Sequence, residues 1–332
     1  MNGRHSLATV ARISGFILFA LASLALTVAA IGLGIVVQPL VIPMVSTPPA
    51  VSASQLEQHV RHFSEDLHPR NHEHVENLER AADYIQKSLK ASGAAVSNQE
   101  VRVEGTRYRN VIARFGPASG PVLVIGAHYD THGDTPGADD NASGVAGLLE
   151  LARLLGRSPP PRAIELVAYT LEEPPHFRTE HMGSAWHARS MKEANRDVEL
   201  MLSLEMIGYF SDQPGSQRFP YSVFAWLYPH QGNFIALVGK LDHFALMRKV
   251  KAAMAGATPL SVRSINAPPT LQGIDFSDHL NYWKEGMPAI MVTDTAFLRN
   301  SNYHRVEDTF EKLDYERMAK VVQGVYAFAQ LR

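Results

Sequence analysis

Two histidines and several carboxylates stand in loops or where predicted strands of the chain end. The predicted strand 122–127 runs into His128 and Asp130, and a later strand runs into the adjacent acids Glu172 and Glu173. Functional side chains of open α/β sheets collect beyond the carboxyl ends of the strands. Histidine and carboxylate groups in such places indicate a divalent metal bound through nitrogen and oxygen. The full set of candidate ligands is His128, Asp140, Glu173, Glu205 and His304.

Five candidate ligands are too many for one catalytic zinc ion, which takes three protein ligands and keeps one position open. They fit two zinc ions, with one carboxylate bridging and a terminal histidine on each ion. Two metals about 3.5–4 Å apart can hold a shared hydroxide and polarise a scissile carbonyl. Glu172 lies beside a candidate ligand and is not needed for binding, so it is free to act as the general base. Asp130 can accept the other ring N–H of His128 and fix its tautomer.

Each of these features has an ordinary structural explanation when it is taken alone. Adjacent acids such as Glu172 and Glu173 usually form a solvated surface pair, and the acids at 139–140 before a helix can be a capping sequence. A single loop histidine such as His304 is more often solvent-facing than metal-binding. The ordered occurrence of all these groups, mostly at strand ends of one chain, favours the metal site.

Apolar strands alternate with amphipathic helices along most of the chain. This alternation predicts an α/β domain with a mixed, mostly parallel central sheet that helices cover on both faces. Helices are predicted at 54–67, 74–92, 142–155, 244–254 and 315–331, and strands at 96–103, 108–115, 122–127, 163–169, 200–204, 223–227 and 289–292.

The N-terminal region predicts a membrane anchor. The 25 residues 13–37 are interrupted only by Ser, Thr and Gly and are long enough to cross a bilayer as one helix. Arg4 and Arg12 precede the run and no charged residue follows until Glu57, which places the N-terminus in the cytoplasm. A cleaved signal peptide and a buried helix are the alternatives. The predicted organisation is a cytoplasmic N-terminus at 1–12, a transmembrane signal anchor at 13–37, a Pro-rich linker at 38–53 and one catalytic domain at 54–332, facing the periplasm or the exterior.

Composition narrows the function further. The chain carries 31 Lys+Arg and 33 Asp+Glu, and this net charge of −2 argues against a nucleic-acid binder. It has no Cys, which excludes thiol nucleophiles, disulfides and Cys-zinc sites. Zinc ligands are therefore restricted to His and carboxylate. The oligomeric state stays open.

Two glycine-rich segments carry a family resemblance. Gly126-Ala127-His128-Tyr129-Asp130 and Gly137-Ala138-Asp139-Asp140-Asn141-Ala142-Ser143-Gly144 resemble the di-zinc aminopeptidases related to bacterial leucyl aminopeptidase, aminopeptidase Y and glutamate carboxypeptidase. The likeness continues through Glu172-Glu173, Gly183-Ser184, Glu205-Met206-Ile207-Gly208, Ser277-Asp278-His279 and Tyr303-His304, and it covers roughly residues 70–332.

The resemblance implies a zinc-exopeptidase fold and two Zn²⁺ per chain. It implies that Asp140 bridges the two ions, that His128 and Glu205 complete one site, and that Glu173 and His304 complete the other. It also implies a cis peptide bond after Asp140.

The same resemblance implies an aminopeptidase that hydrolyses N-terminal peptide bonds of peptide substrates. A metal-bridging hydroxide would be the nucleophile and Glu172 the general base. We expect Asp278 to lie behind the ligands or toward the substrate. Aromatic residues are candidates for the walls of a substrate pocket: Tyr209, Phe210, Phe276 and Phe297.

Two other functions compete with this reading. Glutaminyl-peptide cyclotransferases are zinc acyltransferases of similar fold, but they typically carry Trp immediately before the last His ligand, where this chain has Tyr303. A non-catalytic ectodomain with the peptidase fold is expected to have lost a ligand or the base, and neither is missing here.

Overall fold

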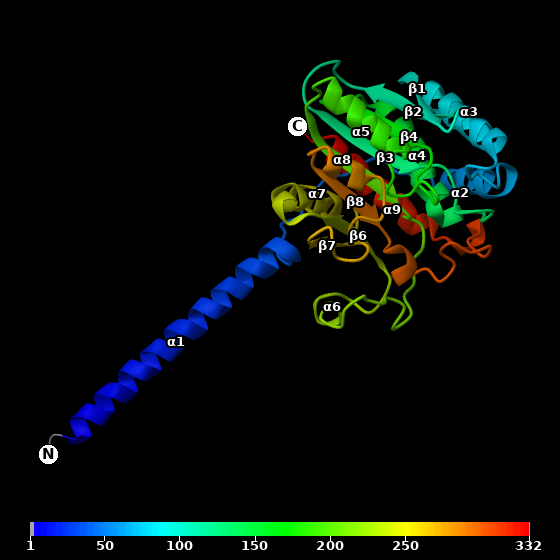
Figure 1. The fold of residues 1–332 in the computed structure, drawn as a ribbon. Helices are drawn as coiled ribbons and strands as arrows, with labels where there is room; N and C mark the ends of the chain where they lie inside the picture. The colour runs from blue at the N-terminus through cyan, green and yellow to red at the C-terminus, as the bar shows by residue number, and fades with distance from the viewer. Residues whose placement is uncertain (1–2, 332) are drawn as a thin grey trace.

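One eight-stranded sheet organises the computed structural model, which describes residues 3–331, with side chains described from residue 14 (Figure 1). The strands are β1 (Ala95–Val103), β2 (Thr106–Phe115), β3 (Val122–His128), β4 (Ala163–Tyr169), β5 (Val198–Glu205), β6 (Phe234–Gly239), β7 (Ser261–Asn266) and β8 (Ala289–Thr293). They lie in the order β1-β2-β4-β3-β5-β8-β6-β7. The pairs β3–β4, β3–β5, β5–β8 and β6–β7 are parallel, and the other three are antiparallel. The prediction of a mixed, mostly parallel sheet is confirmed.

Helices cover both faces of this sheet because successive strand residues point to opposite sides. In β3, Leu123 and Ile125 belong to one hydrophobic cluster, whereas Val122 and Val124 belong to another. The first cluster is closed by α2 (Ala53–Arg61), α3 (Val75–Ala91), α4 (Gly144–Arg157), α7 (Phe244–Ala257) and α9 (Tyr315–Ala329). The second is closed by α5 (Gly183–Glu193) and α8 (His279–Lys284). All residues of β3 and β4 are consequently buried.

The predicted helices are all present, with their ends shifted by a few residues, and one predicted strand is wrong. Residues 224–227 form the short helix α6 (Phe224–Leu227), whose Trp226 side chain is 89% exposed. The sheet instead takes up β6 and β7, which were not predicted. An apolar run of five residues fits a strand or a helical turn equally well, so periodicity did not decide between them.

Helix α1 (Gly3–Val36) projects away from the domain (Figure 1). Its stretch Ser14–Val36 is long and apolar enough to span a bilayer and is not buried in the protein. The last carbonyl groups of a helix lack partners within it. Lys251 Nζ on α7 donates to the carbonyl oxygens of Val37, at 3.1 Å, and Gln38, at 2.9 Å. A cation is favoured at this end of a helix dipole, so the domain holds the end of α1 directly.

The Pro-rich segment between α1 and α2 packs along α7. Met44 N donates to Ala252 O at 2.9 Å, and Ser46 N donates to Gly256 O at 3.1 Å. A Cβ atom at Gly256 would clash with the Met44 carbonyl group, so glycine here lets the two backbones approach closely. The segment therefore lies on the domain instead of standing between the domain and α1.

Substitution Lys251→Met is expected to loosen this junction. It removes the bond to the buried carbonyl group of Gln38 and one of the two bonds to that of Val37, which keeps the bond from Ser264 Oγ. A buried carbonyl group left unsatisfied costs about 1–3 kcal/mol. Limited proteolysis of the detergent-solubilised chain should then cleave between residues 37 and 52 faster than in the wild type. The control is Lys249→Met on the same helix. Lys249 is partly exposed and its Nζ lies 3.7 Å from Glu199 Oε1, a long ion pair that contributes little to stability. Equal cleavage rates for the two variants would contradict the role given to Lys251.

Candidate metal centre

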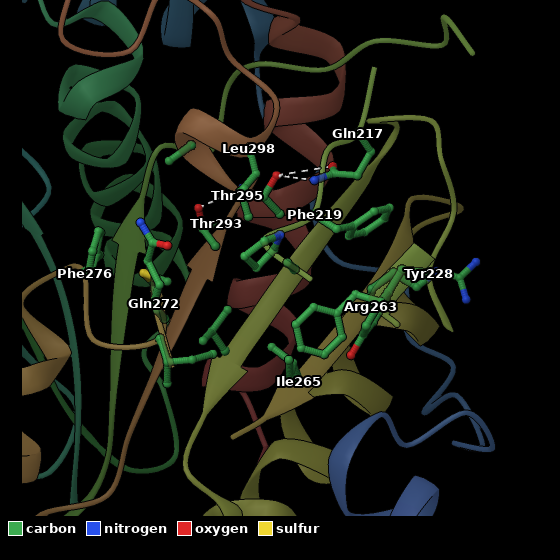
Figure 2. Close-up of a pocket in the computed structure, with 18 of the residues that line it drawn as sticks. Gln217, Phe219, Tyr228, Arg263, Ile265, Gln272, Phe276, Thr293, Thr295 and Leu298 are labelled. Carbon is green, nitrogen blue, oxygen red and sulfur yellow. Dashed lines mark hydrogen bonds between the residues drawn. The ribbon is translucent and has the colours of Figure 1, made fainter. Parts of the chain in front are cut away.

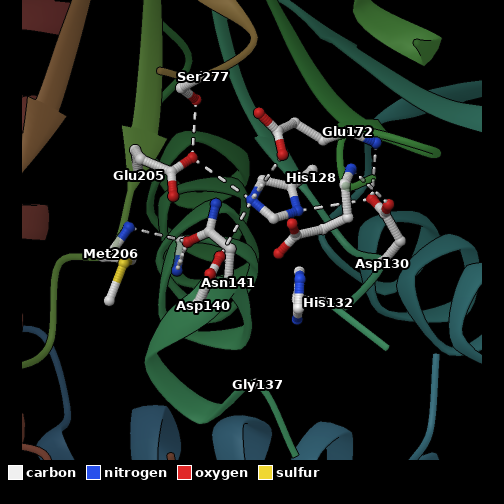
Figure 3. A network of polar contacts seen from close by, with 12 residues as sticks. His128, Asp130, His132, Gly137, Asp140, Asn141, Glu172, Glu205, Met206 and Ser277 are labelled. Atoms are coloured by element: carbon white, nitrogen blue, oxygen red, sulfur yellow. Dashed lines mark hydrogen bonds and ion pairs between the residues drawn. The ribbon is translucent and has the colours of Figure 1, made fainter. Parts of the chain in front are cut away.

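The five candidate ligands converge where neighbouring parallel strands end. Figure 3 labels three of them, His128, Asp140 and Glu205. His128 is the last residue of β3, Glu205 is the last residue of β5, and Glu173 follows β4. Because β3, β4 and β5 run in parallel, these ends lie at one edge of the sheet. Asp140 comes from the turn η2 (Ala138–Ser143) before α4, and His304 from the loop between β8 and α9.

The ligands form two groups that share Asp140. In the first group, His128 Nε2 lies 3.4 Å from Asp140 Oδ1 and 3.4 Å from Glu205 Oε2. In the second, His304 Nε2 lies 3.1 Å from Asp140 Oδ2 and 3.4 Å from Glu173 Oε2. Within each group one ligand atom per residue lies within 4.8 Å of the others. Asp140 thus presents a different oxygen to each group.

Several atoms of these groups are buried and lack hydrogen-bond partners among the described residues. They are both ring nitrogens of His128, Oδ2 of Asp140 and Oε1 of Glu173. A buried polar group without a partner costs about 1–3 kcal/mol. A divalent cation bound through nitrogen and oxygen would satisfy these atoms, and the donor types suit Zn²⁺. The residues present therefore fit a resident metal.

Electrostatics in the site point the same way. Burial raises the pKa of Glu172 well above its usual range; His128 opposes this shift, and the neighbouring Glu173 and Glu205 reinforce it. Burial and then the nearby Asp140 raise the pKa of Glu173 to about 8. Carboxylates this close cannot all stay charged at little cost unless a cation lies among them.

Asp130 orders the residues around it. Its Oδ1 accepts a hydrogen bond from Glu172 N at 3.1 Å, and its Oδ2 accepts one from Glu173 N at 3.0 Å. Asp130 Oδ1 also lies 3.4 Å from His128 Nδ1. The carboxylate therefore contacts the backbone of the acid pair and the far side of the histidine ring together (Figure 3).

Asn141 is a residue whose structural role the sequence did not indicate. Its Nδ2 donates to Leu204 O at 2.8 Å, and its Oδ1 accepts from Met206 N at 3.0 Å and Gly144 N at 3.1 Å. These bonds tie the turn that carries Asp140 to the end of β5. The peptide bond between Asp140 and Asn141 is cis, as the resemblance implied.

Ser277 is a second residue whose role was missed. Its Oγ donates to Glu205 Oε2 at 2.7 Å and lies 2.8 Å from Ser203 Oγ, so it orients the Glu205 carboxylate. The neighbouring Asp278, expected near the site, is fully buried at the start of α8, and burial raises its pKa to about 7. It belongs to neither ligand group.

His304 is held between two aromatic rings. Its ring stacks on Tyr303 at 3.7 Å and on His132 at 3.8 Å between centroids. Burial alone would lower the pKa of His304, but the adjacent Asp140 and Glu173 carboxylates outweigh it and raise that pKa to about 10. A charged or metal-bound state of His304 is therefore favoured over a neutral, free ring.

An apolar cavity of about 120 Å³ begins at Glu205 (Figure 2). Phe234 and Ala236 of β6 line it, whereas the alternate residues Ile235 and Leu237 point into the core on the other face. An apolar cavity of roughly 150 Å³ binds benzene, so this somewhat smaller one has room for an aliphatic side chain such as that of leucine. Other walls are formed by Phe219, Phe224, Tyr228, Ile274, Phe276, Met291 and Phe297. Of the predicted aromatic wall residues, Tyr209 and Phe210 lie outside this lining.

Residues 110–329 match the sequence profile of Peptidase family M28. Uncharacterized protein YfbL of Escherichia coli K12 is 51% identical over 296 residues, which cover 87% of this chain and 91% of that protein. A probable leucine aminopeptidase of Trichophyton verrucosum is 29% identical over 267 residues, covering 75% of this chain and 65% of that one.

Two solved structures share the fold at lower identity. The LapA aminopeptidase of Legionella pneumophila superimposes with a TM-score of 0.67 at 20% identity, covering 84% of this chain and 71% of that one. A glutaminyl cyclase of Bacteroides thetaiotaomicron, bound to N-acetylhistamine, gives 0.65 at 20% identity, covering 86% and 100%.

Substitution Asn141→Ala is expected to destabilise the chain. It leaves Leu204 O, Met206 N and Gly144 N buried without the partners they have now. The free energy of unfolding, measured by urea denaturation in detergent, should fall by about 2–4 kcal/mol. Asn98→Ala on β1 is the matched control, because Asn98 is exposed and should change the free energy by less than about 0.5 kcal/mol. Equal effects at both positions would contradict the role of Asn141.

Proposed function

The chain belongs to peptidase family M28, and on that premise we propose that it is a membrane-anchored zinc aminopeptidase. The observation that carries the proposal is the pair of ligand groups that share Asp140, with a further buried acid, Glu172, beside them and in neither group. Peptides with a free N-terminus would be the substrates.

We assign two zinc ions to the two ligand groups. His128, Asp140 and Glu205 would hold one ion, and Asp140, Glu173 and His304 the other. When bound, the zinc ions supply Lewis acidity that polarises the scissile carbonyl group and acidifies water. The unpaired atoms of His128, Asp140 and Glu173 support this assignment.

Glu172 is our candidate for the general base. It is 6% exposed, and its Oε2 lies 4.0 Å from His128 Nε2, beside the first ligand group. A carboxylate whose pKa is raised by burial is suited to take a proton from the attacking water and pass it to the leaving amine. Asp130 supports this role because it holds the Glu172 backbone N–H.

We propose that the cavity beside Glu205 receives the side chain of the substrate's N-terminal residue. Its walls are largely apolar, with Glu205 and the exposed Arg263 as the charged residues of the lining, so a charged side chain would lose much of its hydration there at high cost. Bulky apolar N-terminal residues are therefore the expected preference.

For the cellular arrangement we propose an uncleaved anchor. Residues 1–12 would be cytoplasmic, 13–37 would span the membrane, and the domain at 54–332 would face the periplasm or the exterior. The support is the apolar, unburied helix Ser14–Val36 and the two arginines before it.

A glutaminyl cyclase remains the rival, since both kinds of enzyme are found among the structures that share this fold. The two are separated by incubating the chain with a Gln-initiated peptide. Release of free glutamine fits our proposal, whereas release of ammonia from an otherwise intact peptide fits the cyclase.

Substitution Glu172→Gln is expected to lower kcat on leucyl-naphthylamide by about 10²–10⁴-fold, because the general base is lost. Zinc content, measured by plasma mass spectrometry, should stay at the wild-type value. The matched control is Glu173→Gln, which removes a proposed ligand and should lower zinc content as well as activity. Wild-type turnover by the Glu172→Gln variant would rule out its role as base.

Substitution Ala236→Leu is expected to fill the cavity. Cleavage of leucyl and phenylalanyl substrates should lose about 10-fold or more in kcat/KM relative to an alanyl substrate. Ala91→Leu at the exposed end of α3 is the control and should keep the wild-type preference. An unchanged preference in the Ala236→Leu variant would place the N-terminal side chain elsewhere.

A further inference from the structure

The exposed large apolar side chains are unevenly distributed over the surface of the domain. Among the side chains described from residue 14 onward, ten such residues outside α1 are exposed, and nine of them lie in three short segments. Single exposed apolar residues are ordinary, whereas their concentration marks an interaction surface. We call these nine the apolar collar: Leu40, Ile42, Met44, Val45, Tyr221, Val223, Trp226, Leu241 and Phe244.

The three segments of the apolar collar meet around the end of α1. The segment 40–45 follows α1 directly in the chain. The segment 241–244 is joined to it because Gln38 Nε2 donates to Phe244 O at 3.1 Å. The segment 221–226 is joined through Tyr228, whose hydroxyl donates to Ser264 O at 2.8 Å. Ser264 Oγ in turn donates to Val37 O at 2.9 Å.

The position of the apolar collar relative to α1 is fixed by hydrogen bonds to the last turn of the helix. Asn266 Nδ2 on β7 donates to Ile35 O at 2.9 Å, in addition to the bonds from Lys251. Val37 and Gln38 are buried at this junction. The 23 residues Ser14–Val36 cover about 35 Å as a helix, close to the roughly 30 Å of a hydrocarbon core. Residues packed around 36–38 would therefore sit at the level of the lipid headgroups.

The chemistry of the apolar collar suits that level. Trp and Tyr are enriched at membrane–water interfaces because their rings are apolar and their N–H or O–H groups remain hydrated. Arg248 and Arg263 are exposed nearby. Burial lowers the pKa of Lys251 to about 8, and the positive charges of Arg263 and Arg248 add to this shift. Asp242, inside the segment 241–244, is an exposed acid in the same region. The two arginines can meet the phosphate groups of lipids, which an apolar protein partner does not offer.

We propose that the apolar collar binds the bilayer that α1 crosses, with Trp226 inserted among the lipid headgroups. The inference rests on the anchor in the proposed function and is independent of the peptidase chemistry. Its consequence concerns the cavity, because Phe224 and Tyr228 line it and flank Trp226 in sequence. One wall of the cavity then lies directly on the lipid surface.

The test is tryptophan quenching in the full-length chain reconstituted into nanodiscs. Discs of phosphatidylcholine and phosphatidylglycerol are made with or without bromine atoms near the headgroup end of the acyl chains. Bromine quenches only at short range, so the wild type should lose emission in the brominated discs. The Trp226→Phe variant should show no loss, because Trp186 on α5 and Trp283 on α8 remain within the domain.

A relocated tryptophan supplies the control. Lys87→Trp on α3, made in the Trp226→Phe background, places the ring near the opposite edge of the sheet from β7 (Figure 1). It should show no loss of emission. Trp226 does not line the cavity, so Trp226→Phe should cleave leucyl-naphthylamide at the wild-type rate.

Each other outcome overturns the inference. If the wild-type chain enters the discs and loses no emission, the proposed anchor stands but the apolar collar does not contact the lipid. Two chains per disc with unquenched Trp226 would assign the apolar collar to a second copy. If the chain does not enter the discs, both the anchor and the role of the apolar collar are rejected. The leucyl-naphthylamide assay tests the peptidase activity separately.

Discussion

Burial of several acids in one small space is the constraint on which the rest of the site depends. Asp140, Glu172 and Glu205 surround His128 at the end of β3, and Glu173 lies beside His304. The mutual repulsion of these acids has to be balanced. A divalent cation bound among the acids would supply that balance, and the backbone keeps the acids in place. Asp130 does so for the acid pair by accepting both of its N–H groups. The parallel strands β3, β4 and β5 bring the acids together because their carboxyl ends meet at one edge of the sheet.

The ligands were easier to predict than the half of the sheet beside them. Strands β3 and β5 are buried apolar runs that stop at His128 and Glu205, and β4 stops shortly before Glu172, so the same pattern marks the element and its functional end. The runs 223–227 and 234–239 are both short and apolar, and only pairing with distant β7 and β8 decides which becomes a strand. Asn141 and Ser277 escaped notice for the same reason. Their partners at the end of β5 lie 63 and 72 residues away in the chain.

The segment 219–228 has one side on the cavity and the other on the surface of the protein. Phe219 and Tyr228 face the cavity beside Glu205, whereas Trp226 faces outward. The stretch between them contains one short helix, α6, and its turns are closed by local backbone bonds, such as Phe224 N to Tyr221 O at 3.1 Å and Tyr228 N to Phe224 O at 3.0 Å. One short segment thus supplies both a wall of the cavity and part of the exposed apolar surface.

The docking of α1 on β7 also has a mechanical meaning. A spanning helix tilts to match its length to the thickness of the bilayer around it. A flexible tether would absorb that tilt, but the buried bonds from Lys251 to Val37 and Gln38 leave no joint to absorb it. In a membrane, α1 would act as a lever on the sheet. Thinner and thicker bilayers would then hold the edge that carries the ligand groups at different angles and heights. With the peptidase function proposed above, membrane thickness would select which peptide ends can reach that edge.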